Sequence, residues 1–202
     1  MEYYQQLITE KSFQILQTLK KDSHFILIGG WAVFFYTRAL KSKDIDIIID
    51  FAELESLRQK YEIFKNDRLK KYEIKLETTD IDIYLPFYSR LGLPAEIIAE
   101  HTLSLEGFIV PKIEILLILK QVAYNGRLGT PKGEKDKIDI FSLLNLKIIN
   151  WKFYQKLLAE NNLPEPQQDL LSLLAQTTEV KEINLNQNQT AKLKKDILIN
   201  LK

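Results

Sequence analysis

One short segment, Ile45–Phe51, constrains the fold of this chain more than any other. Its sequence, IDIIIDF, is rich in isoleucine, which is typical of a strand buried in a sheet. Asp44 and Asp46 stand at its start and share one face, with Ile45 on the other, because side chains alternate along a strand. Alternating acidic residues often mark a solvated strand face, but this strand is too apolar for that interpretation. The segment predicts a strong strand with a functional carboxylate pair at its start.

A strand that ends in two glycines precedes this segment. Phe25–Ile28 is predicted to be a short buried strand, Gly29 and Gly30 end it, and a helix is expected over residues 31–38. A helix N-terminus presents backbone N–H groups to anions, and glycine lets a ligand approach the backbone closely. Arg38, Lys41 and Lys43 lie between the two motifs and would add positive charge. A structural turn explains most isolated Gly-Gly pairs, so the order of the two motifs carries the prediction.

A third acidic motif follows in a predicted hairpin. Strands are expected over residues 72–76 and 81–85, with a turn near Thr78 and Thr79 and a stop at Pro86. Asp80 and Asp82 share one face, and either can be the third carboxylate. If neighbouring strands bring Asp44, Asp46 and Asp82 together, the cluster is costly unless a divalent cation neutralises it. Magnesium prefers oxygen ligands and shares them with phosphates, so we expect a magnesium site.

Composition narrows the chemistry further. The chain has 202 residues and no cysteine, which excludes a disulfide scaffold, a thiolate zinc site and a cysteine nucleophile. Its two histidines, His24 and His101, are expected to be structural or surface residues, so any metal should bind carboxylates. Lysine and arginine total 28 against 27 acidic residues, which gives no bulk sign of a nucleic-acid or membrane partner. Without a signal-peptide pattern or a long apolar run, we expect a cytoplasmic protein with no membrane partner.

The remaining pattern divides the chain into two parts. Residues 1–110 are predicted to form a mixed α/β core, and residues 111–202 an all-helical region. Asp50 is expected to cap the helix over 52–65, and Phe108–Val110 is expected to be a short edge strand. Polar connections are predicted over residues 162–166 and 184–189. Further helices are expected over residues 3–20, 112–125, 134–144, 150–161, 167–176 and 190–201.

These motifs together resemble a known family. GG at 29–30, a short helix, SKDID at 42–46 and IDIYLPFYSRL at 81–91 resemble the nucleotidyltransferase fold of the DNA polymerase beta superfamily. The closest resemblance is to its small prokaryotic AbiEii-like branch, and it favours Asp82 over Asp80. ILLILKQVAY at 115–124 and KGEKDKIDIFSLL at 132–144 resemble the helical region that follows the family's core. There a lysine and a Lys-Asp-x-x-Asp pattern map to Lys120, Lys135, Asp136 and Asp139. The resemblance covers about residues 20–145.

The resemblance implies a fold, an activity and a set of roles. The fold would be a nucleotidyltransferase-type mixed sheet with flanking helices, followed by helices. Asp44 and Asp46 would bind two Mg²⁺ ions, and Asp82 would complete the metal site and help to deprotonate the acceptor. Gly29 and Gly30 would hold the β- and γ-phosphates, although many relatives have Gly-Ser there. Lys120 would reach the triphosphate or the acceptor, and Arg38 and Lys43, from their place between the two motifs, would add phosphate contacts.

The implied reaction transfers a nucleoside monophosphate from a nucleoside triphosphate (NTP) to a hydroxyl and releases pyrophosphate. The acceptor would be an RNA end, a protein or a small molecule. A toxin role with a cognate antitoxin protein is carried by the resemblance alone. The rival interpretation is a non-catalytic nucleotide-binding or protein-interaction module on the same fold. Intact Asp44, Asp46 and Asp82 argue against that rival.

Several of these residues have a purely structural alternative. Lys120 lies in an apolar helix, where it would reach the surface or pair with Asp136 or Asp139. Arg38, Lys43 and Arg90 are also expected as solvated charges. Trp31 is expected to anchor the core, with a place beside the nucleotide as the alternative.

Overall fold

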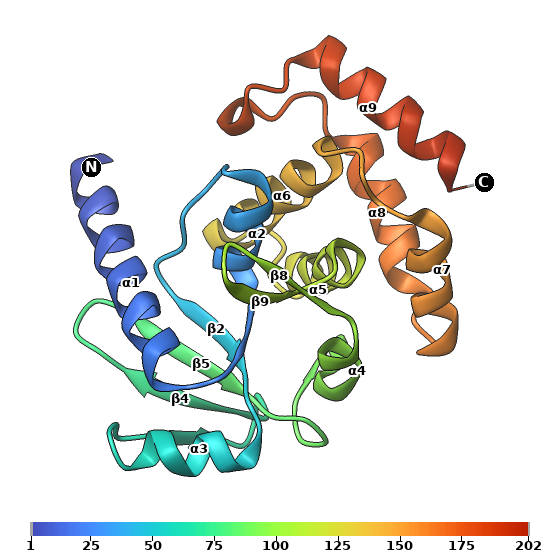
Figure 1. The fold of residues 1–202 in the computed structure, drawn as a ribbon. Helices are drawn as coiled ribbons and strands as arrows, with labels where there is room; N and C mark the ends of the chain where they lie inside the picture. The colour runs from blue at the N-terminus through green and yellow to red at the C-terminus, as the bar shows by residue number, and fades with distance from the viewer. Residues whose placement is uncertain (1, 202) are drawn as a thin grey trace. The chain divides into compact units, whose positions relative to one another are not determined.

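The structure, a computed structural model, describes residues 2–201, with side chains from residue 6 onward. Contacts divide the chain into a first unit, residues 1–112, and a second unit, residues 113–202. The division falls two residues after the domain boundary predicted from the sequence. Figure 1 labels helices and strands of both units. Among the described residues, each helix is too short or too polar to serve as a membrane span.

The first unit is a mixed α/β domain. A seven-stranded sheet has the order β3-β4-β5-β2-β1-β9-β8, with β2 parallel to β5, β1 parallel to β9 and the other neighbours antiparallel. The elements of the first unit, in chain order, are α1 (Glu2–Asp22), β1 (Ile26–Ile28), α2 (Gly29–Thr37), β2 (Ile45–Ile48), α3 (Phe51–Arg58), β3 (Phe64–Asn66), β4 (Lys71–Lys75), β5 (Asp80–Tyr84), β6 (Arg90–Leu91), β7 (Leu93–Pro94), α4 (Ala95–Glu100), β8 (Thr102–Leu105) and β9 (Phe108–Pro111).

The strand predicted to begin at Ile45 is β2, which lies at the centre of this sheet. Ile45 and Ile47 are fully buried, and their register partners on β5, Ile81 and Ile83, are buried on the same face. Leu27 of β1, opposite Ile47, extends this apolar face. Burial of this row supplies the hydrophobic energy that fixes the strand register.

Two sequence predictions about side chains in this unit are confirmed. Trp31 is buried in the core, where its Nε1 donates a hydrogen bond to Ser12 Oγ at 3.0 Å and its ring lies 5.3 Å from that of Phe13. Asp50 caps α3, because its Oδ1 accepts the backbone N–H of Glu53 at 2.8 Å. Trp31 therefore ties α1 to α2, and Asp50 has a structural role.

The prediction of an edge strand over 108–110 is wrong. β9 lies inside the sheet, between β1 and β8, and β8 forms the edge. β8 was not predicted because its residues, TLSL, are half-buried or exposed and give a weak apolar signal. The helix predicted over 52–65 is also shorter than expected. It ends at Arg58, because the chain must enter β3 at Phe64.

The second unit is all-helical, as predicted. Its elements are α5 (Ile113–Asn125), α6 (Pro131–Asn145), α7 (Trp151–Glu160), α8 (Glu165–Gln176), the 3₁₀ helix η1 (Lys181–Ile183) and α9 (Gln187–Asn200). α5 is its central helix and contacts α6, α7 and α8, which explains its almost continuous apolar sequence. Helices α8 and α9 begin inside the predicted polar connections. At α9 a capping box between Asn186 and Gln189 sets the start.

Candidate functional site

The strand register places three carboxylates in one row across the first unit's sheet. Asp46 of β2 lies opposite Asp82 of the parallel strand β5, and Asp82 lies opposite Glu73 of β4. All three are half-buried and lie on the face opposite the buried isoleucines. We call Asp46, Asp82 and Glu73 the acidic row. The predicted proximity of Asp46 and Asp82 thus follows from neighbouring strands.

Asp44 lies beside this row. It precedes β2 by one residue, is half-buried, and contributes a negative charge that acts on Asp82. The exposed Asp80 lies opposite Lys75 at the start of β5. This arrangement favours Asp82 over Asp80 as the partner of Asp46.

A glycine brings the turn between β1 and α2 close to Asp46. Gly29 has a φ of +67°, which side chains with a Cβ rarely adopt, and a Cβ there would lie 2.1 Å from Asp46 Oδ2. Ile28, at the N-cap of α2, has no side chain that can cap the helix. The start of α2 therefore lies directly against the Asp46 carboxylate. The backbone N–H groups at the start of α2 would also favour a bound anion.

A lysine that the sequence analysis missed lies inside the acidic row. Lys71 Nζ lies 2.6 Å from Asp82 Oδ2 and 3.0 Å from Glu73 Oε1, and Asn66 Nδ2 donates to Glu73 Oε1 at 2.9 Å. The alternation of Lys71, Glu73 and Lys75 was visible in the sequence. Their partner strand could be assigned only with the hairpin register, so Glu73 and Lys71 were not singled out.

Burial and neighbouring charges both shift the pKa values of Asp82 and Lys71. Burial raises the pKa of Asp82, the charges of Glu73 and Asp44 act in the same direction, and Lys71 opposes them without cancelling the rise. Burial lowers the pKa of Lys71, but its hydrogen bonds to Asp82 and Glu73 outweigh burial and leave that pKa raised. Lys71 is therefore a firmly protonated cation beside the carboxylates.

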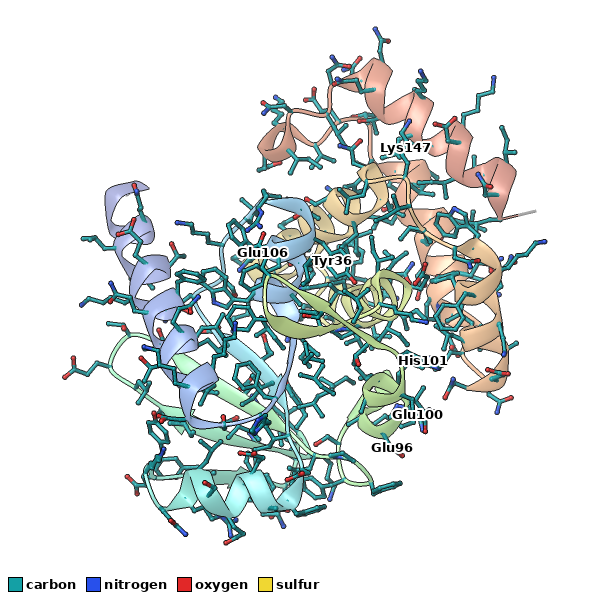
Figure 2. The ribbon with its side chains drawn as sticks, in the orientation of Figure 1. Tyr36, Glu96, Glu100, His101, Glu106 and Lys147 are labelled. Carbon is teal, nitrogen blue, oxygen red and sulfur yellow. The ribbon has the colours of Figure 1, made fainter. Side chains whose placement is uncertain are left out.

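The two predicted phosphate contacts between the motifs lie in different surroundings. Arg38 ends α2 in a left-handed conformation, forms an ion pair with Glu106, and lies over the rings of Phe34 and Phe35. Glu106, labelled with Tyr36 in Figure 2, comes from the turn between β8 and β9. Lys43 is exposed in the segment that leads into β2. A phosphate contact of either residue stays a prediction.

Lys120 belongs to the second unit and forms a buried ionic cluster there. Its Nζ lies 3.0 Å from Asp136 Oδ1 and 2.6 Å from Asp139 Oδ2, and Arg127 reaches Asp136 Oδ2 at 3.1 Å. Burial lowers the pKa of Lys120, but the two carboxylates outweigh it and raise the pKa overall. The structural alternative weighed from the sequence, pairing with Asp136 or Asp139, is present, and nucleotide binding by Lys120 stays a prediction.

The side chains present fit part of the predicted metal set. Asp44 and Asp46 are two half-buried carboxylates, and Asp46 lies beside the start of α2. Magnesium completes such a donor pair with water and phosphate oxygens. Within residues 6–201, no three side chains of the acidic, histidine or cysteine types are arranged to hold one ion. Asp82 faces the Lys71 ammonium. The fit is therefore to a carboxylate pair, without Asp82.

Comparisons with known proteins show the fold. No family model matches the chain, and no curated protein sequence matches it. The chain is similar to the solved structure of JHP933 from Helicobacter pylori, with a TM-score of 0.51 and 15% identity over 96% of this chain and 91% of that one. It is also similar to a candidate nucleotidyltransferase from H. pylori, with a TM-score of 0.50 and 16% identity over 96% and 94%. The mixed sheet followed by helices is thus a nucleotidyltransferase-type fold.

Proposed function

We propose that this chain is a magnesium-dependent nucleotidyltransferase. It would transfer a nucleoside monophosphate from an NTP to an acceptor hydroxyl and release pyrophosphate. The observation that carries the proposal is the register that sets Asp46 beside Asp82, with Gly29 at the start of α2 against Asp46. The nucleotidyltransferase-type fold supports it.

Each part of the site has a role in this reaction. The N-terminus of α2 at Gly29 and Gly30 would bind the β- and γ-phosphates through backbone N–H groups. Asp44 and Asp46 would hold Mg²⁺, which would supply positive charge to the triphosphate as the leaving group departs. The acceptor oxygen forms a bond to the α-phosphorus while the bond from that phosphorus to the pyrophosphate oxygen breaks. Asp82 would take the hydroxyl proton.

The donor base, the acceptor and any antitoxin partner belong to the proposal only by resemblance. RNA ends, protein hydroxyls and small-molecule hydroxyls all fit the chemistry. A toxin role would follow only if the acceptor is a molecule that the cell needs. The acceptor class must therefore be found by experiment.

Label transfer tests the proposal. The full chain is incubated with each of the four α-³²P-labelled NTPs, Mg²⁺, and RNA, protein or small-molecule acceptors. We expect one acceptor class to gain label, and Asp46→Asn to abolish the transfer. Asp80→Asn is the matched control, because Asp80 is an exposed aspartate on the same sheet face. Equal labelling by wild type and Asp46→Asn, or no labelling of any acceptor, would count against the enzyme and favour the non-catalytic module.

A further inference from the structure

The acidic row has one feature that the proposed reaction does not use, its lysine. Glu73, Asp82 and Asp46 lie side by side on β4, β5 and β2, and like charges opposite one another on a sheet destabilise it. Lys71 shares the strand face of Glu73, two residues away. It is therefore placed to neutralise the row from inside the protein.

Lys71 is held tightly in that position. Its side chain is only 11% exposed, and its partners Asp82 and Glu73 are 21% and 16% exposed. β4 begins at Lys71, and the preceding carbonyl, of Lys70, accepts a hydrogen bond from Ser89 Oγ at 2.5 Å. Ser89 Oγ also accepts the N–H of Leu85 at 3.0 Å. The start of β4 is thus fixed to the chain that follows β5.

Lys75 shows what an ordinary surface lysine does on the same strand face. Its side chain is 62% exposed, and its Nζ lies 3.9 Å from Glu73 Oε2. Such exposed pairs contribute little, whereas short charge-assisted hydrogen bonds in a buried setting are strong. Lys71 and Lys75 therefore form a natural pair for comparison, with the same charge and strand but different burial.

We propose that Lys71 is a built-in cation of the site, which holds Asp82 in an ion pair, so that the site takes one divalent cation, on Asp44 and Asp46, and not two. A second ion on Asp82 would have to bind a carboxylate whose Oδ2 already lies 2.6 Å from the Lys71 ammonium, so the two cations would compete for one negative charge. The inference rests on the proposed function only for the ion that it assigns to Asp44 and Asp46. In the reaction, Lys71 is a positioning residue that acts through Asp82.

Counting bound Mn²⁺ tests the inference without any turnover. The full chain is titrated with Mn²⁺ alone, and free ion is measured by electron paramagnetic resonance. We expect one ion per chain for wild type, one for Asp82→Asn, and none for Asp44→Asn/Asp46→Asn. Lys71→Met should expose Asp82 to a second ion, whereas the matched Lys75→Met should still bind one. Circular dichroism checks that each variant is folded.

The outcomes separate this inference from the proposed function. Two ions on wild type, with one lost in Asp82→Asn, would overturn the role of Lys71 and leave the enzyme proposal standing. A folded Lys71→Met that binds one ion would also overturn it. No Mn²⁺ on wild type would overturn both proposals together. If Lys71→Met does not fold, the wild-type and Asp82→Asn counts still decide.

Discussion

At the scale of single residues, the site depends on how closely Gly29 and Asp46 approach each other. The sequence showed Gly29 only as part of a common Gly-Gly pair. In the structure it has a positive φ, and its Cα faces the Asp46 carboxylate with no room for a methyl group. Gly129, in the second unit, has a similar φ of +75° and nothing within 4 Å of an added Cβ. A side chain at either position would strain the backbone, but only at Gly29 would it also clash with a neighbour.

We expect Gly29→Ala to be much more damaging than Gly129→Ala. In both variants the free energy of unfolding should fall by about 1–2 kcal/mol, because alanine is strained in the left-handed region. Gly29→Ala should lower the free energy of unfolding further, because the added methyl group must displace Asp46. The same displacement should weaken NTP binding. Urea unfolding measures the stabilities and calorimetry the binding. Equal costs for the two variants, with NTP binding intact, would mean that the close approach to Asp46 is unimportant.

At the scale of elements, strand register decides what was predictable. The isoleucines of β2 indicated an apolar strand, and the alternation of Asp44, Ile45 and Asp46 indicated which residues share a face. The pairing of Asp82 with both Asp46 and Glu73 depends on which strands are neighbours and how they align. A single sequence does not determine those long-range alignments, so Lys71 and the internal position of β9 could not be predicted.

The helices α5 and α6 offer a second test at this scale. Lys120 of α5 is buried between Asp136 and Asp139 of α6. Replacing it with methionine leaves two buried carboxylates without their ammonium, so Lys120→Met should lower the free energy of unfolding by about 3–5 kcal/mol. Lys137→Met removes the exposed ion pair between Lys137 and Glu134, which both lie on α6. It should lower the free energy of unfolding by less than about 1 kcal/mol.

The difference in unfolding free energy between wild type and Lys120→Met should depend on pH in one direction. The folded-state pKa of Lys120 is raised above the ordinary lysine value of 10.5, so its stabilisation is fully present below pH 10.5. It is lost as pH rises through the folded-state pKa. The gap in unfolding free energy between wild type and Lys120→Met should therefore stay constant from pH 7 to 10 and shrink above pH 10.5. A gap that shrinks below pH 9 would contradict this sign.

At the scale of the whole molecule, the candidate residues are divided between the two units. The acidic row, Asp44 and the start of α2 belong to residues 1–112, whereas the Lys120 cluster belongs to residues 113–202. The sequence predicted both the mixed α/β part and the all-helical part. It could not predict the partners of the buried charges, because each depends on the packing of elements far apart in the chain. The proposed magnesium site therefore lies within the first unit.

Nucleotide binding is the first measurement to make on this site. Each of the four NTPs is titrated by calorimetry and thermal shift, with and without Mg²⁺, into wild type and Asp44→Asn/Asp46→Asn. We expect Mg²⁺-dependent binding of at least one NTP, which adds about 2.7 kcal/mol of stability at 100-fold excess over Kd, and we expect its loss in the double variant. NTP binding that does not depend on Mg²⁺, NTP binding that survives in the double variant, or no binding of any NTP would show that Asp44 and Asp46 do not form a magnesium–nucleotide site.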